Sequence, residues 1–392
     1  WRARLLLRAR LGASEPLPPS RSLDLRAAPH GGILADRLRR GVELPACRID
    51  AARLAVLNAL DARERGAVVR RCCEVTSLKR RAQHWEALVR TPGGEHRIDA
   101  RQVVNAAGPW AGEVLAMAFP GRERMELRFA KSIALVLPRL WQGEHGYLFS
   151  SDEGRIVFAM PHERDFTLLG THDLPCEAAP GDVSVDAREA AELCAAASAC
   201  LPVPVAPEAA VARFAGLRVL AEDAAGGVGS QRFELDQGGD GTAPAMLTIF
   251  GGGQASARGR AEEALSLLGT PGKRWSAAKP LPGGAIDWLR FEAFVADQQR
   301  RWPWIGPQMN RRLARAYGTR MARILAGAQG HHDLGTHMGG GLYSAELAYL
   351  VSHEFARTPE DVLRRRSQLG LRLTEEEQAR VAEWFARLDL AD

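Results

Sequence analysis

Hydrophobic and polar positions predict a strand, a turn of small residues and a helix over residues 103–119. The strand and turn read Val-Val-Asn-Ala-Ala-Gly-Pro-Trp at residues 103–110. The valines suit a buried strand, the alanines and the glycine place little bulk over the backbone, and the proline ends the hydrogen-bonded ladder. This order places backbone N–H groups at the carboxyl end of a strand, where open α/β sheets bind nucleotides. An ordinary strand-to-helix turn is the alternative interpretation.

A second strand, glycine run and helix follow at residues 245–268. The strand leads into Gly251, Gly252, Gly253 and Gln254, and apolar residues at helical spacing come directly after them. Three glycines before a helix N-terminus leave backbone amides open to an anion or a flat ring. A glycine run alone also fits a flexible hinge. Two such turns, one at each end of an inserted sheet, are a more specific signal.

The segment between these turns has the pattern of an antiparallel sheet. Short strands separated by polar or glycine turns run from residue 128 to about residue 220, with an alanine-rich helix at residues 185–201. Before the first turn, apolar spacing predicts a helix at residues 50–61 that Asp50 caps. A meander of strands is then expected at residues 68–78, 85–90 and 96–99.

The two ends of the chain differ from this middle part. Residues 12–34 are rich in Pro, Ser and Gly and predict a loop. Residues 280–284 predict a linker, and the chain after them is predicted to be helical. The expected helices cover residues 288–301, 309–317, 320–327, 345–356, 359–369 and 375–388. The pattern of strands and helices predicts a mixed α/β protein. A chain of 392 residues is too long for one ordinary hydrophobic core, so we expect several domains.

The composition is that of a globular protein without a nucleic-acid partner. Hydrophobic residues make up 46% and charged residues 25% of the chain. The net charge is +5, but nearly all of the positive charge is arginine, which together with abundant alanine indicates codon bias. No basic patch is interleaved with aromatic residues, as single-strand binding requires.

Cysteine and histidine patterns give no metal site. The six cysteines show no C-x-x-C pair and fit a reducing compartment, and Cys72 and Cys73 are expected as buried thiols in the middle of a strand. The spacing of His331, His332, Asp333 and residues 337–354 matches no established metal site.

The start of the chain suggests a surface role. No apolar run is long enough to span a membrane, and we expect no signal peptide from these residues. Residues 1–11, which mix arginine, leucine and tryptophan, suit a helix lying on a membrane or a docked helix with extended arginines.

The chain begins with Trp1 inside this helical pattern, so we expect a fragment. The expected location is the cytoplasm, with peripheral attachment to the inner membrane face as a further hypothesis.

The ordered motifs resemble the FAD-linked glycerol-3-phosphate dehydrogenases, which pass electrons from glycerol 3-phosphate to quinone. The similar segments cover nearly the whole chain. They are the residues 40–41, 50–54, 104–110, 155–158, 170–173, 216–218, 250–252, 281–286, 345–354 and 361–365.

The resemblance implies four segments. Residues 1–127 form a partial FAD-binding domain without its ADP-binding start, and residues 128–211 form an antiparallel substrate domain. Residues 212–279 return to the FAD-binding domain, and residues 280–392 form a helical cap. The family's G-x-G-x-x-G segment has no counterpart here, so we expect these residues alone to bind FAD weakly or not at all.

Three polar positions depart from the family's pattern. Ala134 stands where the family has histidine, Gly253 where it has lysine, and Gln231 where it has arginine, with Arg232 adjacent. These changes leave open a paralogue with another substrate or with impaired catalysis. A non-catalytic binding protein that does not hold FAD is the alternative from a different class.

The resemblance also implies which residues contact FAD. The small turn and the glycine run lie along the flavin side, and the start of the meander lies near the adenine. The residues are Glu74, Val75, Ala106, Ala107, Gly108, Trp110, Gly251, Gly252, Gly253 and Gln254.

Oxidation of a secondary alcohol needs a base for the hydroxyl proton and a cation for the phosphate. Arg218 follows Gly216 and suits bidentate phosphate binding. His172 is the candidate base, with Asp173 to orient it, although the sequence alone favours a structural histidine over this role. We expect the substrate to contact Arg218, Thr171 and Lys131. Glycerol 3-phosphate and quinone are the expected partners, and a homodimer is compatible with the sequence.

Overall fold

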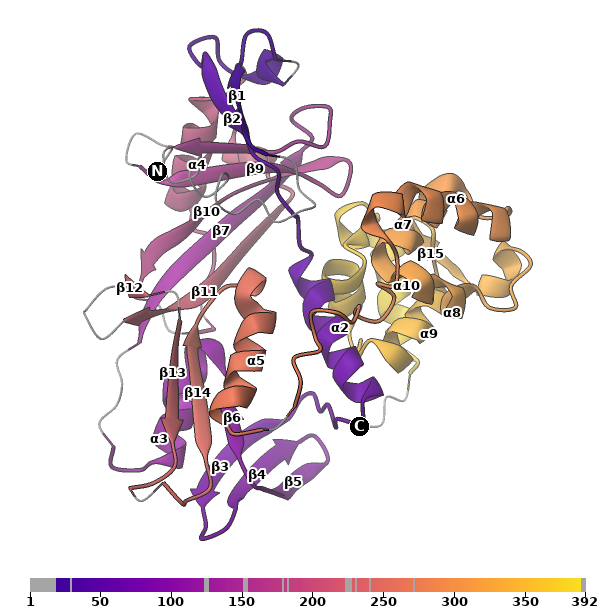
Figure 1. Ribbon diagram of the computed structural model, residues 1–392. Coiled ribbons are helices and arrows are strands. Elements are labelled where there is room, and N and C mark those ends of the chain that lie inside the picture. The colour runs from indigo at the N-terminus through magenta and orange to yellow at the C-terminus, as the bar shows by residue number, and fades with distance from the viewer. Residues whose placement is uncertain are drawn as a thin grey trace.

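The computed structural model describes residues 19–28, 30–122, 127–150, 154–177, 180–181, 183–222, 228–229, 231–239, 241–270 and 272–388. Figure 1 shows the helical C-terminal part beside a β-rich body, with α2 (Ala51–Glu64) lying between them. The predicted N-terminal surface helix at residues 1–11 lies outside the described residues. No described helix has both the length and the apolar character needed to cross a bilayer.

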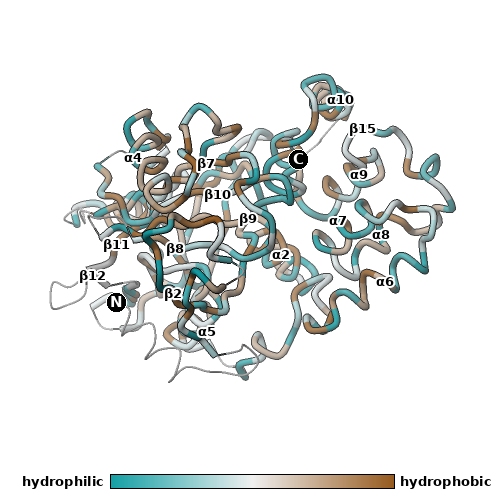
Figure 2. Tube along the Cα trace, turned by 90° about the horizontal axis from the view of Figure 1, so that it is seen from above, coloured by the Kyte–Doolittle hydropathy of each residue, from teal (hydrophilic) through white to brown (hydrophobic). Residues whose placement is uncertain are grey.

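The predicted insert is a six-stranded antiparallel sheet, in the order β12-β11-β7-β10-β9-β8. Its strands are β7 (Arg128–Pro138), β8 (Tyr147–Ser150), β9 (Ile156–His162), β10 (Phe166–Cys176), β11 (Ala212–Glu222) and β12 (Val228–Gly229). Helix α4 (Ala187–Ser198) covers one face and buries a core that includes Leu135, Leu169 and Leu193. In Figure 2 hydrophobic residues follow β7 and β10 at the centre of this sheet.

The two predicted turns belong to a second, three-stranded sheet. Strand β14 (Met246–Gly251) pairs in parallel with β6 (Val103–Asn105) and antiparallel with β13 (Gln231–Asp236). Both parallel strands lead into helices: η2 (Gly108–Trp110) and α3 (Ala111–Ala118) follow β6, and η4 (Gln254–Ser256) and α5 (Ala257–Leu267) follow β14. Parallel strands end at the same sheet edge, so the fold brings the two turns to one edge.

The predicted meander is present, but its first strand is shorter than expected. The strands are β3 (Glu74–Arg80), β4 (Trp85–Thr91) and β5 (Gly94–Ala100). Cys72 precedes β3 with φ 50° and is exposed, so the expectation of thiols within the strand was wrong. Trp85 is fully buried and joins the meander to the core beneath α3.

The N-terminal loop prediction was wrong in part. Strands β1 (Arg21–Asp24) and β2 (Arg40–Glu43) pair as an antiparallel hairpin that encloses η1 (Gly31–Ile33). The cap predicted for α2 is confirmed, because the Asp50 side chain accepts a hydrogen bond from the Arg53 N–H.

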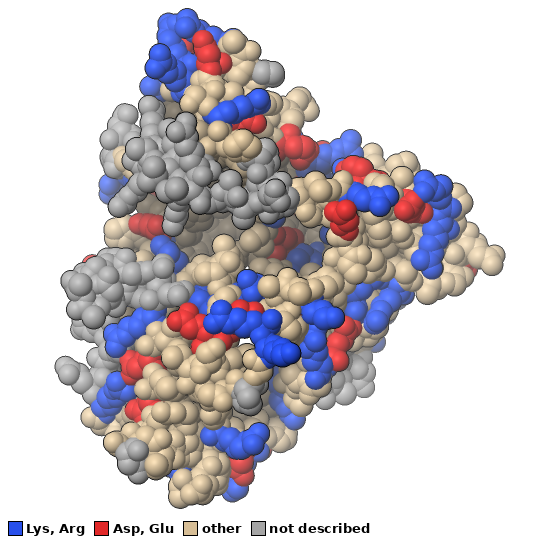
Figure 3. Space-filling model, in the orientation of Figure 1, with Lys and Arg blue, Asp and Glu red and all other residues tan. Residues whose placement is uncertain are grey.

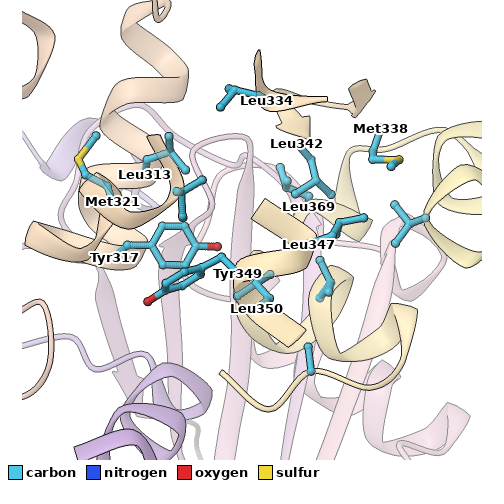
Figure 4. Close-up of a cluster of buried hydrophobic side chains, with 14 of the residues drawn as sticks. Leu313, Tyr317, Met321, Leu334, Met338, Leu342, Leu347, Tyr349, Leu350 and Leu369 are labelled. Atoms are coloured by element: carbon cyan, nitrogen blue, oxygen red, sulfur yellow. The ribbon is translucent and has the colours of Figure 1, made fainter. Parts of the chain in front are cut away.

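The C-terminal part is helical as predicted, with one addition. Its helices are η5 (Trp288–Arg290), α6 (Phe291–Arg301), α7 (Pro307–Tyr317), η6 (Gly318–Arg320), α8 (Met321–Leu325), η7 (His331–Leu334), α9 (Ser344–His353), the π-helix η8 (Asp361–Arg366), η9 (Leu369–Leu371) and α10 (Glu375–Ala386). A small hairpin of β15 (His337–Gly339) and β16 (Leu342–Tyr343) was missed, because glycines dominate it. Figure 4 shows the core of this part, in which Tyr317 and Tyr349 lie side by side.

Two ion pairs, one of them buried, join α2 to the C-terminal part. Arg53 of α2 donates to Glu354, whose side chain is fully buried. Arg320 pairs with Glu64 at the other end of the helix, at 2.7 Å. These contacts fix α2 against the helical part.

Candidate active site

The turn after β6 is held by a buried side chain. Asn105 donates through Nδ2 to the Ala111 carbonyl at 2.9 Å, and its Oδ1 accepts from the Ala107 N–H at 3.3 Å. Gly108 has φ 57°, and a Cβ placed on it would meet nothing within 4 Å. Asn105 therefore shapes a turn whose outer side is open. Asn105 was given no role from the sequence. An asparagine at the boundary between a strand and a turn is nevertheless a signal for a turn.

The turn after β14 is open on the same sheet edge. Gly251 and Gly252 have φ 68° and 90°, values that favour glycine. The N–H groups of Gly252, Gly253 and Gln254 donate no hydrogen bond within the described part of the chain. A Cβ on Gly253 would also meet nothing within 4 Å. Free amides at a helix N-terminus suit the polar edge of a flat ring or an anion.

Exposed apolar residues lie along this part of the fold. Trp110 in η2 is 46% exposed, and Val104 in β6 is 47% exposed. Open glycine turns next to uncovered apolar side chains fit a large flat cofactor, and the residues therefore fit FAD. Glu74 and Val75, the predicted adenine contacts, are the first two residues of β3. Within the described residues, no hydrogen bond joins these two to either turn.

Strand β11 connects the six-stranded sheet to the two turns. It contacts both η2 and β14, and Val219 packs with Met246 and Phe250 in one core. Strand β11 therefore joins the six-stranded sheet, whose second face α4 leaves uncovered, to the part of the fold that carries the two turns. Figure 3 shows that the molecule is hollowed between its upper, six-stranded part and its lower part.

Polar side chains gather on this uncovered face. His172 contacts Ser132 of the neighbouring strand, with Nδ1 and Oγ 3.0 Å apart. The register of β10 against β7 shifts between Thr171 and Leu174, and this bulge carries His172 and Asp173. Bulges re-aim side chains next to functional sites. Asp173 has φ 65° and forms an ion pair with Arg218 of β11.

An aromatic ring supports the histidine. Phe158 stacks on His172 with 4.9 Å between ring centroids and 25° between ring planes. Gly170 makes room for this ring, because a Cβ there would lie 2.3 Å from the Phe158 Cζ. Desolvation lowers the pKa of His172; the Asp173 carboxylate opposes this shift, and Arg218 adds to it. The imidazole is thus neutral at pH 7 and able to accept a proton.

Two predicted substrate residues lie on the other face of the sheet. Lys131 Nζ is 2.7 and 2.8 Å from the carboxylate oxygens of Glu189 in α4. Thr171 is buried, and its Oγ1 donates to the Ile156 carbonyl at 2.8 Å. Side chains alternate between the faces of a strand, so neither joins Ser132 and Arg218. The structure therefore brings His172 and Arg218 together without Lys131 and Thr171.

The three departures from the family pattern lie in different parts of the fold. Ala134 lies two residues after Ser132, on the same side of β7. Gln231 is paired with Gly251 in the β13–β14 ladder, and Gly253 is exposed. Within the described residues, no group of three or more His, Cys, Asp or Glu side chains is placed to hold a metal ion.

Family models match almost the whole chain. The model described as "FAD dependent oxidoreductase" matches residues 1–257. The model described as "C-terminal domain of alpha-glycerophosphate oxidase" matches residues 276–388. The match thus covers both the glycine turns and the helical part.

Curated relatives and a solved structure agree with these models. A glycerol-3-phosphate dehydrogenase of Pseudomonas aeruginosa is 36% identical over 391 residues, which cover 98% of this chain and 76% of the relative. A D-erythritol 1-phosphate dehydrogenase of Brucella abortus is 34% identical over 402 residues, covering 100% and 80%. The FAD complex of glycerol-3-phosphate dehydrogenase from Bacillus halodurans has the same fold, with TM-score 0.71, 24% identity and coverage of 90% and 76%. The chain therefore belongs to the family of FAD-linked glycerol-3-phosphate dehydrogenases and is a flavoprotein dehydrogenase.

Proposed function

We propose that this protein oxidises glycerol 3-phosphate to dihydroxyacetone phosphate with FAD and passes the electrons to quinone. The proposal draws on the relatives named glycerol-3-phosphate dehydrogenase. The observation that carries it is the cluster of His172, Ser132 and Arg218 on the sheet face opposite α4, in a sheet whose strand β11 contacts both η2 and β14.

His172 is the proposed acceptor of the hydroxyl proton. In the tautomer that carries its proton on Nδ1, the imidazole donates to Ser132 Oγ and keeps the Nε2 lone pair free. Phe158 holds the ring by stacking on it. A neutral imidazole of fixed orientation is a suitable general base near neutral pH.

Arg218 is the proposed phosphate ligand. Its guanidinium has the planar fork that binds phosphate oxygens in pairs. Asp173 now pairs with it, and this carboxylate is 60% exposed. A bound phosphate would compete with Asp173 for the guanidinium, so Asp173 acts as an internal competitor that the substrate displaces.

When FAD is bound, its flavin ring accepts the hydride. The two turns of this chain would hold the flavin ring. Gly252, Gly253 and Gln254 offer their amides at the α5 end, and Ala106 to Gly108 leave room beside η2. Quinone as acceptor and attachment at the inner membrane face are part of the same proposal. Both rest on the family resemblance.

The direct test is turnover of the purified protein that carries FAD. Glycerol 3-phosphate is supplied with an artificial acceptor and then with a ubiquinone analogue, and dihydroxyacetone phosphate is measured. The proposal expects product with both acceptors. Product with the artificial acceptor alone would contradict the quinone part, and no product with either would contradict the reaction.

A longer polyol phosphate is the second candidate substrate. A Cβ on Gly216, beside Ser132 in the sheet, would meet nothing within 4 Å, so this face has room for a further hydroxymethyl group. The Brucella abortus relative is named for a four-carbon substrate. Comparing kcat/KM for glycerol 3-phosphate and D-erythritol 1-phosphate decides between them.

A further inference from the structure

One arginine of α5 binds two carbonyl groups of the glycine turn after β14, and we call this pair of hydrogen bonds the clamp. Arg260, in the first turn of α5, donates through Nη1 to the Gly251 carbonyl and through Nη2 to the Gly253 carbonyl at 3.0 Å. The two bonds bracket Gly252. A Cβ on Gly252 would lie 1.7 Å from Arg260 Nη1, so the guanidinium fills the space behind that residue.

This clamp determines which backbone groups stay available. The carbonyls of Gly251 and Gly253 are engaged by Arg260, whereas the N–H groups of Gly252, Gly253 and Gln254 have no acceptor within the described residues. The turn therefore presents donors to a ligand while its carbonyls are satisfied by the protein. Without Arg260 the Gly251 carbonyl would lose this donor and the space behind Gly252 would empty, whereas the Gly253 carbonyl would still accept from the N–H and Oγ of Ser256 at 3.2 and 3.0 Å.

The charge of Arg260 has no carboxylate partner in the described part of the chain. Its Nε is buried without a hydrogen-bond partner, and both Nη atoms bind neutral carbonyls. Arg258, two residues earlier on the same helix, differs because it pairs with Glu262 at 3.0 Å. A half-buried cation without a counter-ion favours a neighbouring anion.

We propose that Arg260 positions the flavin-binding turn and, through its uncompensated charge, favours the reduced over the oxidised cofactor. Two-electron reduction adds negative charge to the flavin ring, and a cation behind the turn stabilises that charge. Arg260 is a positioning residue, since it acts through the glycine turn. This inference rests on FAD as the cofactor but is independent of the substrate.

The test measures FAD affinity and flavin midpoint potential in Arg260→Leu, Arg260→Lys and the matched control Arg258→Leu. No alcohol substrate is added, so failure of this inference and failure of the proposed reaction are distinguishable. For Arg260→Leu we expect FAD binding to weaken about tenfold. We also expect the ratio of affinities for reduced and oxidised flavin to fall about tenfold, which lowers the potential by about 30 mV for a two-electron couple.

The lysine variant separates charge from the clamp. Arg260→Lys keeps the charge but has no planar fork, so we expect weaker FAD binding with the affinity ratio held within about twofold. Arg258→Leu is expected to change neither quantity by more than about twofold. Unchanged affinity and potential in Arg260→Leu, or an equal shift in Arg258→Leu, would overturn the proposal. If the leucine variant does not fold, a tenfold fall of the ratio in the lysine variant overturns the charge part.

Discussion

The Nδ1 atom of His172 lies 3.0 Å from the Oγ of Ser132, across the bulge between β10 and β7. This contact fixes one imidazole nitrogen, and stacking on Phe158 fixes the ring plane. Ala134, where the family has a histidine, lies on the same side of β7 as Ser132. This arrangement is the reason that we propose His172 as the base on this face.

Replacing His172 by alanine is expected to lower kcat about 100- to 10,000-fold, because a positioned general base contributes in that range. His96→Ala, at an exposed position of β5, is the control and should retain full turnover. Steady-state assays with an artificial acceptor measure both. Unchanged turnover in His172→Ala would show that this histidine has a structural role only.

The pH profile gives an independent test of the same base. Burial lowers the pKa of His172, so the imidazole loses its proton at a lower pH than an ordinary histidine. Activity should therefore be constant near pH 7 and decline on acidification, with a midpoint below 6.5 in kcat/KM. Ser132→Ala should move this midpoint, because it removes the Nδ1 partner. A midpoint that is the same in both proteins would argue against the Ser132–His172 pair.

Arg218→Met is expected to lower kcat/KM for glycerol 3-phosphate about 10- to 100-fold by removing charge-assisted hydrogen bonds to phosphate. Asp173→Asn should act in the opposite direction and lower KM, since it removes the competing carboxylate. Arg213→Met, on the same strand but facing α4, is the matched control. Equal losses in the Arg213 and Arg218 variants would rule out a specific phosphate contact.

The buried Arg53–Glu354 pair should dominate the attachment of α2 to the helical part. Removing one partner leaves a buried charge, so Arg53→Met is expected to lower the free energy of unfolding by about 3–5 kcal/mol. Arg300→Met, which breaks the exposed pair with Asp297, should change it by less than about 1 kcal/mol. Urea denaturation monitored by circular dichroism measures both variants. Similar values for the two would show that the buried pair contributes little.

His162 should make the fold sensitive to acid. Burial lowers the pKa of His162 to about 4, and Arg48 beside it acts in the same direction. The folded state therefore holds this imidazole neutral while the unfolded chain takes up a proton below pH 6.5. Stability is unaffected by His162 above that pH and falls by about 3 kcal/mol between pH 6.5 and 4. In His162→Phe the free energy of unfolding should depend less on pH between 6.5 and 4. The same dependence on pH in this variant and the wild type would contradict the role of His162.

Local patterns predicted most of the fold. The strands, turns and helices around residues 103–119 and 245–268 follow from β-branched runs, glycines and helical spacing. The β1–β2 hairpin was missed, because its short strands lie in a segment of loop composition and are defined by their pairing. Cys72 was wrongly placed inside a strand. Its φ of 50° interrupts the extended backbone before β3, and no glycine marks this position in the sequence.

The candidate site was predictable only in part. His172 and Arg218 were chosen for their chemistry, and the structure places His172 against Ser132 and Arg218 against Asp173 of the same bulge. Ser132 itself was missed, because only the bulge after Thr171 brings it opposite His172. Alternate residues of β7 face opposite sides of the sheet, and Lys131 falls on the side that α4 covers. The sequence alone does not tell which side of the sheet a helix covers, so this position could not be predicted. Arg260 gave no signal, because one arginine in a charged helix looks like any other.

Anaerobic reduction of the bound flavin by glycerol 3-phosphate tests the central claim most directly. The wild-type protein, Arg218→Met and His172→Ala are mixed with the substrate, and the loss of flavin absorbance is followed in a single turnover. The account predicts rapid, complete bleaching in the wild type, bleaching that needs higher substrate concentrations in Arg218→Met, and slow bleaching at all concentrations in His172→Ala. A wild-type flavin that stays oxidised with saturating substrate, or equal rates in all three proteins, would contradict it.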